Sequence, residues 1–278
     1  MSSFHLTQGD TPVLVSMPHA GTHLTPQVEV GLSHRGLSLI DTDWHIPRLY
    51  DFLDAQGVGR LQAKYSRYVV DLNRSADDKP LYAGATTGLF PEVDFDGEPL
   101  YRAGHAPSKD ARDWALDNVW RPYHLALSEE LARLRRRFGY AVLFDAHSIR
   151  SQVARLFDGQ LPDINLGTND GGSCDATLSD RLESVCAAQS SYSWVVNGRF
   201  KGGFITRHYG TPNKDVHAVQ LELSQVTYME EPREGALVDA STTFPYRERE
   251  AKQVQALLIA LVEELLVWRP RREPETIG

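Results

Sequence analysis

The apolar positions of the chain form short continuous runs and longer helical patterns, and the two kinds alternate. The runs at 13–17 and 140–144 are continuous, which is typical of parallel strands with both faces buried. Further strands are predicted at 68–72, 163–166, 194–197, 204–208 and 219–223, and helices at 44–56 and 178–189. This alternation predicts an α/β fold.

Two longer helices are predicted from apolar side chains at spacings of three, four and seven. The first carries Trp120, Leu127, Leu131, Leu134 and Phe138, with Pro122 kinking or restarting it. The second has one apolar stripe formed by Val254, Leu257, Leu258, Leu261, Val262 and Leu265. We expect both stripes to cover the core of the domain.

The 278 residues contain no internal repeat, low-complexity tract or Pro/Ser-rich linker. We therefore predict a single domain over 1–278, with a mostly parallel or mixed sheet flanked by helices. The stretch 75–107 is rich in Gly, Pro and Asp and reads as a long loop. Because loops longer than about 15 residues are usually functional, we predict that it is a lid or insertion over a site.

Composition is that of a folded domain, with 41% hydrophobic and 24% charged residues. The net charge of −8 argues against a nucleic-acid partner, since phosphate contacts need a basic face. The basic cluster 133–137 falls at the end of a predicted helix, where it complements the helix dipole. We see neither a signal peptide nor a membrane span, and only two cysteines, so we expect a soluble cytoplasmic protein with no membrane partner.

Two predicted strands run into a histidine, His19 after 13–17 and His147 after 140–144. Ligands of open α/β sheets bind at the carboxyl ends of strands. The stretch 41–45, Asp-Thr-Asp-Trp-His, offers potential ligands at alternate positions. Two imidazoles and a carboxylate form the ligand set of a catalytic zinc, with a fourth position open to water. The alternative is that each histidine is structural.

Other polar residues also stand at strand ends or inside a strand. The strand at 68–72 leads into Asn73-Arg74, and the predicted strand at 204–208 presents Arg207 and His208. Guanidinium groups bind carboxylates bidentately, so two arginines at one sheet edge predict an anionic substrate, unless they form structural ion pairs. Glu222 lies within an apolar strand, where an ionised carboxylate needs a partner or a task. Near a metal it could accept a proton from water.

Competing chemistries lack their sequence signatures. No serine stands in a Gly-x-Ser-x-Gly elbow, which argues against a serine hydrolase. No phosphate-binding loop is present, and the Gly-Gly pairs at 171–172 and 202–203 are too isolated to bind a dinucleotide.

Several motifs along the chain resemble those of the N-formylglutamate deformylase family. They are PHAG at 18–21, DTDWH at 41–45, DLNR at 71–74, DAHS at 145–148, NGRFKGGFITRHYG at 197–210 and QLELSQ at 220–225. The resemblance spans nearly the whole chain. It implies a zinc-type amidohydrolase of histidine degradation that converts N-formyl-L-glutamate to formate and L-glutamate. The chain also looks distantly similar to the zinc carboxypeptidase and aspartoacylase group.

The wider group's functional residues can be matched to this sequence one by one. His19 and His147 match its two histidine ligands. Asn73 and Arg74 match its substrate-contacting Asn-Arg pair, and Glu222 matches its catalytic glutamate.

One metal ligand does not transfer. The wider group has a glutamate three residues after its first histidine, where this sequence has Thr22. The carboxylate must then come from elsewhere, and we predict Asp43. The competing candidates are Asp41, His45 and His23.

These residues give a hypothesis for catalysis. A zinc ion held by His19, Asp43 and His147 would activate water, with Glu222 as the base. Arg74 and Arg207 would hold the two carboxylates of the substrate. Two alternatives stay open: a hydrolase of another N-acyl acidic amino acid, and a non-catalytic protein that binds an amino-acid derivative. A binding protein has no need of a metal or of Glu222.

Overall fold

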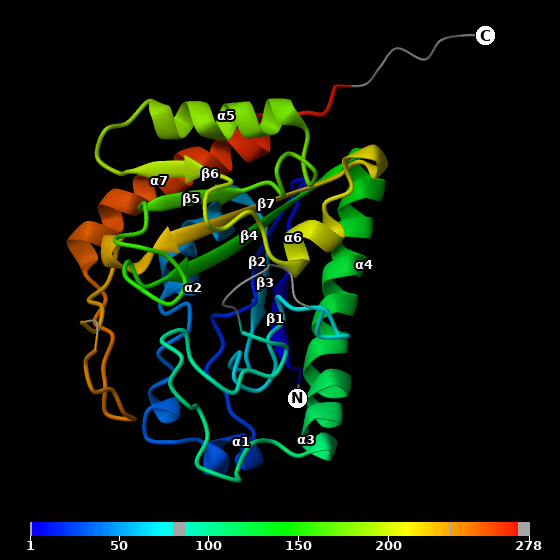
Figure 1. Ribbon diagram of the computed structural model, residues 1–278. Helices are drawn as coiled ribbons and strands as arrows, with labels where there is room; N and C mark the ends of the chain where they lie inside the picture. Colours follow the sequence, from blue (N-terminus) through cyan, green and yellow to red (C-terminus); the bar gives the residue numbers. More distant parts are fainter. Residues whose placement is uncertain (1, 80–86, 234, 272–278) are drawn as a thin grey trace.

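The computed structural model describes residues 2–79, 87–233 and 235–271. Its strands are β1 (Phe4–Thr7), β2 (Val13–Met17), β3 (Gly59–Ala63), β4 (Ala141–Ile149), β5 (Ile164–Gly167), β6 (Trp194–Val196) and β7 (Val216–Ser224). Its α-helices are α1 (Pro26–Gly31), α2 (Ile46–Leu49), α3 (Lys109–Ala115), α4 (Arg121–Phe138), α5 (Ala176–Ala187), α6 (Phe204–Tyr209) and α7 (Glu248–Val267). Figure 1 shows how these elements surround one central sheet.

The seven strands form a mixed sheet in the order β1-β3-β2-β4-β7-β5-β6. Its centre is parallel, because β4 pairs with β2 on one side and with β7 on the other. The outer pairs β1–β3 and β5–β7 are antiparallel. The predicted mixed α/β sheet is confirmed.

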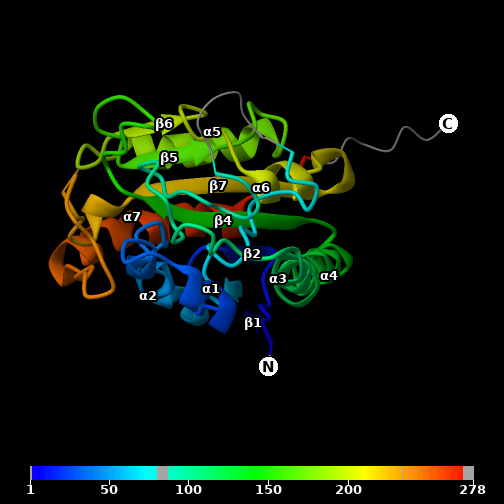
Figure 2. The same ribbon diagram turned by 60° about the horizontal axis from the view of Figure 1, so that its bottom comes forward.

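Both faces of the sheet are covered, which explains the continuous apolar runs. One face packs Val15, Phe144 and Val219 against the stripes of α5 and α7. The opposite face packs Leu14 and Leu143 against α4. Figures 1 and 2 show α4 and α7 on opposite sides of β4.

The apolar α4 face of the sheet becomes polar toward the carboxyl ends of β4 and β7. Successive side chains of a strand point to opposite faces, so Asp145 and His147 share the face of Leu143. In register beside them, Gln220 lies opposite Asp145, and Glu222 lies opposite His147. Four polar side chains therefore stand together on one face of two paired strands.

Strand β4 is longer than the strand that we predicted at 140–144. We predicted that the strand ends at residue 144 and that the polar residues follow it. Strand β4 continues to Ile149, and all nine of its residues are buried. The functional side chains therefore project from the strand itself, which fixes their direction more firmly than a loop would.

The predicted strand at 68–72 is wrong. Val69 donates its N–H to Ser66 O (2.9 Å), which closes a turn, and Asp71 donates to Leu89 O (2.8 Å). Tyr68, Val69, Val70 and Leu72 are buried in the α4-side core, so burial rather than strand pairing accounts for their apolar character.

The predicted strand at 204–208 is also wrong, because these residues form helix α6. β-branched Ile205 and Thr206 favour a strand locally. The helix begins after Gly202, whose φ is +111°, and Asn73 Oδ1 accepts a hydrogen bond from Ile205 N (2.8 Å). A capping side chain from a distant segment thus overrides the local preference.

The predicted helix at 44–56 is shorter and divided. Helix α2 starts after His45, which has a φ of +63°, and a 3₁₀ helix, Asp51–Gln56, follows it. The other predicted helices agree with α4, α5 and α7, and Pro122 lies in the first turn of α4, after a π-helical segment, Leu116–Trp120. No described helix has the length and apolar character needed to cross a bilayer.

Residues 80–86 of the predicted lid, 75–107, lie outside the described residues. In its described part, Asp94 and Asp96 form ion pairs with Arg35, and Asp96 also pairs with Arg150 Nη2 (2.9 Å). Asp41 Oδ2 accepts a hydrogen bond from Phe95 N (3.0 Å). These contacts hold residues 94–96 against the rest of the domain.

Candidate active site

His19 follows β2 and is fixed by a buried carboxylate. Its Nε2 lies 2.7 Å from Asp71 Oδ1, and both residues are buried. Asp71 also accepts hydrogen bonds from Arg67 Nη2 (2.6 Å) and Asn73 N (2.8 Å). Burial would raise the pKa of Asp71, but Arg67 and His19 outweigh it and hold the pKa well below its ordinary value. An ionised Asp71 accepts the Nε2 proton of His19 and leaves Nδ1 as its lone-pair atom.

His147 is held in the same way from β4. Its Nε2 lies 2.9 Å from Asp145 Oδ2, and Asn73 Nδ2 lies 3.0 Å from the same nitrogen. Its Nδ1 lies 3.2 Å from Asp43 Oδ2. The ring therefore places Nε2 against Asp145 and turns Nδ1 toward Asp43, and Nδ1 can bind a metal once its proton is released.

Asp43 completes a three-residue cluster. The turn that carries it is tied to β2, because Asp43 N donates to His19 O (3.0 Å). Asp43 Oδ2 lies 3.9 Å from His19 Nδ1. One ligand atom each from His19, Asp43 and His147 lies within 4.8 Å of the others, and all three residues are buried.

The donor set fits a divalent transition metal. Two imidazole nitrogens and one carboxylate oxygen converge, and each imidazole has a carboxylate on its other nitrogen, as ligating histidines usually do. Burial, followed by the positive charge of Arg67, lowers the pKa of His19, which favours the neutral form that binds metals. Burial alone would lower the pKa of His147, but Asp145 and Asp43 raise it well above its ordinary value. The cluster thus attracts positive charge to its centre.

Glu222 lies beside this cluster on β7. Gln220 Nε2 donates to Glu222 Oε2 (3.2 Å), and Gln220 Oε1 accepts from Gly203 N (2.7 Å). Burial raises the pKa of Glu222 to about 8, against the opposing effect of His147 and with a contribution from Asp43. A carboxyl group with such a pKa can both take up and release a proton near neutral pH.

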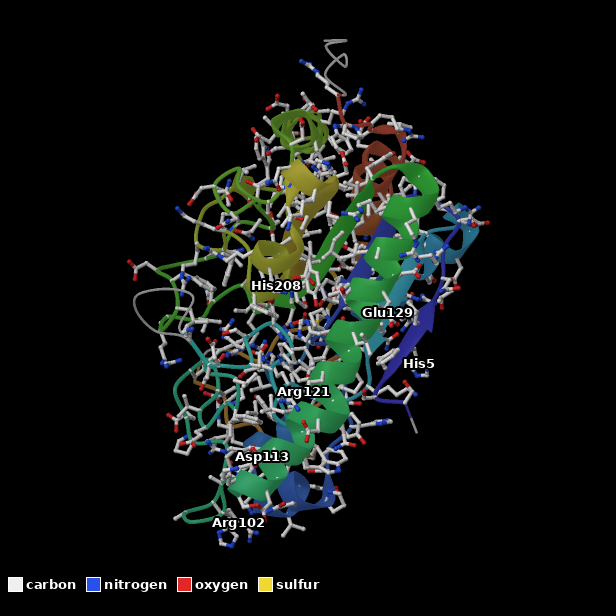
Figure 3. All side chains as sticks on the ribbon, turned by 90° about the vertical axis from the view of Figure 1, so that its right-hand side faces the viewer. His5, Arg102, Asp113, Arg121, Glu129 and His208 are labelled. Atoms are coloured by element: carbon white, nitrogen blue, oxygen red, sulfur yellow. The ribbon has the colours of Figure 1, made fainter. Side chains whose placement is uncertain are left out.

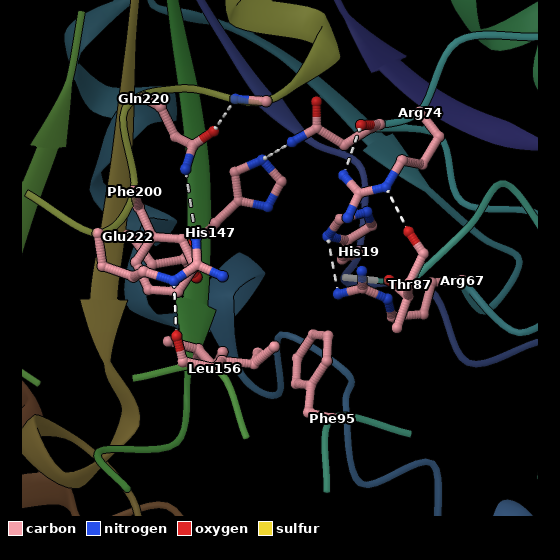
Figure 4. A pocket seen from close by; sticks show the side chains of 14 residues that line it. His19, Arg67, Arg74, Thr87, Phe95, His147, Leu156, Phe200, Gln220 and Glu222 are labelled. Carbon is pink, nitrogen blue, oxygen red and sulfur yellow. Dashed lines mark hydrogen bonds between the residues drawn. The ribbon is translucent and has the colours of Figure 1, made fainter. Parts of the chain in front are cut away.

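A cavity opens over these side chains (Figure 4). It is lined by His19, Arg67, Asn73, Arg74, Thr87, Phe95, His147, Ile149, Leu156, Arg199, Phe200, Gly203, Gln220 and Glu222. Arg67 Nη1 lies 3.3 Å from His19 Nδ1, so a buried positive charge adjoins the metal-type cluster. The cavity therefore combines candidate ligands, a candidate base and three guanidinium groups.

The structure brings most of the predicted site residues together. Asn73 and Arg74 line the cavity with His19, His147 and Glu222.

The other two predicted substrate residues are not among the residues that line this cavity. Arg207 lies on α6, and its Nε donates a hydrogen bond to Gly202 O (2.8 Å). His208 is exposed and stacks on Phe204, with ring centroids 4.8 Å apart. Figure 3 shows His208 beside α4, on the side of the molecule where Asp113, Arg121 and Glu129 are exposed.

The competing ligand candidates lie apart from the cluster. Asp41 accepts a hydrogen bond from Phe95 N, and His45 Nε2 contacts Phe244 O. His23 forms an isolated bridge with Tyr65. Among the described residues, the group that could hold a metal is His19, Asp43 and His147, in agreement with the choice of Asp43.

Several residues of the site were not predicted from the sequence. Asp71 stood inside the DLNR motif, and Arg199 stood inside the NGRFKGG motif, so both were in view without a function. Arg67 precedes the first of these motifs, and no local pattern marks it. Its position beside His19 follows from the turn at 66–72, of which residues 68–72 were predicted as a strand.

The mixed sheet, with a buried cluster of histidines and carboxylates at the carboxyl edge of its parallel centre, places the protein among hydrolytic enzymes of the α/β class. Residues 11–229 match the family model described as N-formylglutamate amidohydrolase. The chain belongs to this family.

Curated relatives agree with this assignment over nearly the full length. The N-formylglutamate deformylase of Pseudomonas aeruginosa is 58% identical over 265 residues, which cover 95% of this chain and 96% of that protein. The N-formylglutamate deformylase of Pseudomonas putida is 56% identical over 270 residues and covers 97% of each chain.

Solved structures share the fold at lower identity. The crystal structure of N-formylglutamate amidohydrolase from Ralstonia eutropha JMP134 matches with a TM-score of 0.78 and 23% identity, covering 96% of this chain and 99% of that one. A gene product from Agrobacterium tumefaciens matches with a TM-score of 0.70 and 17% identity, covering 95% of both chains. At these identities the likeness concerns the fold alone.

Proposed function

We propose that this protein hydrolyses N-formyl-L-glutamate to formate and L-glutamate. The observation that carries the proposal is the buried cluster of His19, Asp43 and His147 beside the buried Glu222, in a cavity lined by arginines. The Pseudomonas relatives, at 56–58% identity, are named N-formylglutamate deformylase. We place the reaction in histidine degradation, as the sequence resemblance implies, and the cytoplasmic location stays a prediction.

We propose zinc as the metal, held by His19, Asp43 and His147, because two imidazoles and a carboxylate suit it better than magnesium. When bound, zinc would polarise the formyl carbonyl and lower the pKa of water. The chain's own contribution is orientation: Asp71 and Asp145 fix the two imidazole rings from behind.

Glu222 is the proposed general base. It takes a proton from the water whose oxygen bonds to the formyl carbon, and it returns a proton to the nitrogen as the carbon–nitrogen bond breaks. Burial raises its pKa, so the ionised form of Glu222 accepts a proton more strongly than an ordinary carboxylate does. Gln220 Nε2 donates a hydrogen bond to Oε2 of Glu222 and so holds this carboxylate in place. Arg67, fixed beside His19, offers positive charge to the oxygen that becomes negative during attack.

We assign substrate binding to Asn73 and Arg74, because both line the cavity next to His147. The roles of Arg207 and His208 stay predictions. Phe95 and Thr87, which lie in the predicted lid segment, also line the cavity, and this supports the proposal that the segment covers the site.

We further propose kinship with the zinc carboxypeptidase and aspartoacylase group. The support is the shared arrangement of residues: an Asn-Arg pair at 73–74, an Asp-x-His strand motif at 145–147 and a buried glutamate in the adjacent strand β7. This chain differs from the pattern of that group in two respects: position 22 is not a glutamate, and Asp43 lies near both histidines.

The deciding experiment is formate release from N-formyl-L-glutamate by zinc-supplemented protein, with and without a chelator. We expect turnover that the chelator abolishes and that added zinc restores. N-acetylglutamate serves as the competing substrate, because faster turnover of it would favour a hydrolase of another N-acyl acidic amino acid. Tight binding of N-formylglutamate without turnover, by a protein free of metal, would instead identify a binding protein.

A further inference from the structure

Two walls of the cavity carry guanidinium groups. Figure 4 shows Leu156 and Phe200 on one side of the cavity, and Arg74 and Thr87 on the other. Arg199 lies with the first wall, because its Nε donates to Leu156 O (2.6 Å) and its guanidinium carbon is 5.4 Å from the centre of the Phe200 ring. A substrate in the cavity therefore lies between two arginines that come from distant parts of the chain.

Both guanidinium groups are oriented by backbone carbonyls. Arg74 donates through Nε to Thr87 O (2.8 Å) and through Nη1 to Asn73 O (3.2 Å). Together with the bond from Arg199 to the Leu156 carbonyl, these bonds fix the direction of both guanidinium groups. A half-buried guanidinium held in this way is well suited to bind a carboxylate bidentately.

The two arginines differ in how they are connected to the cluster of His19, Asp43 and His147. Arg74 adjoins Asn73, whose side chain touches His147. Arg199 stands among apolar side chains, since Leu156 and Phe200 pack on a small buried cluster that contains Ile149 and Val153. In N-formylglutamate, the α-carboxylate is on the carbon next to the amide nitrogen, and the γ-carboxylate is two methylene groups further away.

We propose that Arg199 binds the γ-carboxylate of the substrate, while Leu156 and Phe200 contact its methylene groups, and that this wall selects glutamate derivatives. The inference rests on the proposed function and adds the residue that determines side-chain specificity. Arg74 then binds the α-carboxylate close to the scissile bond. This assignment makes Arg199 the second carboxylate-binding arginine in place of Arg207, which lies on α6 with its Nε bonded to Gly202 O.

The test compares two substrates in the Arg199→Gln variant, supplied with zinc. N-formylglutamine has the shape of N-formylglutamate but lacks the γ charge. We expect kcat/KM for N-formylglutamate to fall on the order of 100-fold, mainly through KM, because a buried carboxylate loses its partner. Turnover of N-formylglutamine should change little, so the preference for the charged substrate collapses. Arg199→Lys should keep part of the preference, since it keeps the charge but not the fork.

Lys201→Gln is the matched control. Lys201 lies two residues further along the same segment, and its Nζ forms a partly exposed ion pair with Asp170 Oδ1 (3.0 Å). Its loss removes the same charge but no cavity-lining group, so the substrate preference should stay at the native value. Thermal unfolding of both variants shows whether the segment remains folded.

Three outcomes would overturn the inference. Equal losses on both substrates in Arg199→Gln would mean that Arg199 only supports the wall. Collapse of the preference in Arg207→Gln, with the preference retained in Arg199→Gln, would assign the γ-carboxylate to Arg207. A wild-type protein that releases formate from neither substrate would contradict the proposed function itself, and with it this inference.

Discussion

At the scale of single residues, the site depends on which carboxylate faces the two histidines. Asp41 and Asp43 are two residues apart and both are buried; we predicted Asp43 from the sequence and kept Asp41 as a competing candidate. The structure separates them, because Asp43 Oδ2 lies within 4 Å of both imidazoles, whereas Asp41 Oδ2 binds Phe95 N. The physical reason for preferring Asp43 is not visible in the local sequence, since it depends on how the turn at 41–44 is oriented against β2.

The first prediction follows from this difference. His19→Ala, His147→Ala and Asp43→Ala should each lose bound zinc, because each removes one of three ligands. Asp41→Asn should keep zinc, since the amide oxygen can still accept the hydrogen bond from Phe95 N. Metal content of the purified variants, measured by atomic absorption, checks this. Loss of zinc in Asp41→Asn with retention in Asp43→Ala would exchange the two assignments.

The second prediction concerns the carboxylates behind the histidines. Asp71→Asn and Asp145→Asn should weaken zinc binding roughly 10- to 100-fold, because each imidazole keeps an acceptor for its Nε2 proton but loses the negative charge that strengthens this bond. Competition with a chromophoric chelator measures the affinity. Asp170→Asn, which removes only the surface partner of Lys201, is the control and should leave the affinity unchanged.

The third prediction separates binding from chemistry. Glu222→Gln keeps the shape of the side chain but cannot accept a proton, so kcat should fall on the order of 100-fold or more. Bound zinc should remain, as Glu222 is outside the ligand cluster. Steady-state kinetics together with metal content test both parts. Near-native kcat would exclude Glu222 as the base and would direct attention to Asp145.

At the scale of elements, the sequence predicted best where burial and local preference agree. Strands β2, β4 and β7 are apolar and β-branched, and both of their faces are covered, so pattern and environment coincide. The segments 68–72 and 204–208 have a similar composition but a different environment. The first is a buried turn, and the second is a helix capped by Asn73, so their structures depend on contacts from outside the segment.

The start of α6 gives the fourth prediction. Gly203 has a φ of −81°, which any residue can adopt, yet a Cβ there would lie 2.2 Å from Asn73 Nδ2. Gly203→Ala should therefore displace Asn73 and, through the bond from Gly203 N to Gln220, disturb Glu222. We expect a loss of stability of about 1–3 kcal/mol from overpacking and a larger relative loss of kcat/KM. Chemical denaturation and formate release measure the two effects.

Gly104→Ala is the control for this prediction. Gly104 has a φ of +76°, and a Cβ added there would have no atom within 4 Å, so alanine meets backbone strain but no collision. It should cost about 1 kcal/mol of stability and leave kcat/KM unchanged. If both variants lose activity in proportion to their stability, the close approach of Gly203 to Asn73 has no specific role in the site.

At the scale of the whole molecule, the fold was predictable because it depends on averages over many residues. Two apolar layers cover the sheet, and they are formed by the apolar stripes of α4, α5 and α7 and by the apolar runs of the central strands. These layers do not depend on the conformation of the loops. The assembly of the cavity was less predictable. Phe95, Arg199 and Glu222 come from three segments that meet only when the domain is folded, and no local pattern encodes their proximity.

A buried histidine outside the proposed catalytic machinery gives the last prediction, on the stability of the whole domain against acid. His124 on α4 contacts Leu72 O through Nε2 (2.9 Å) and Tyr209 Oη through Nδ1 (3.0 Å). Burial lowers its pKa to about 3, although the bond to Leu72 opposes the shift. The unfolded chain, with an ordinary histidine pKa near 6.5, therefore binds a proton between about pH 6.5 and 3 that the folded chain does not.

The contribution of His124 to stability is consequently full above about pH 6.5 and falls as the pH drops toward 3, by up to about 1.4 kcal/mol per pH unit. Wild type and His124→Gln should differ in this slope and in no other part of the profile, because the remaining titrating groups cancel in the comparison. Urea unfolding at pH values from about 7 to 4 measures it. Glutamine can still donate to Leu72 O but cannot be protonated, so its profile should be flatter between about pH 6.5 and 4. Parallel profiles would mean that His124 accepts its proton without unfolding the contacts between α4, α6 and the turn at 66–72.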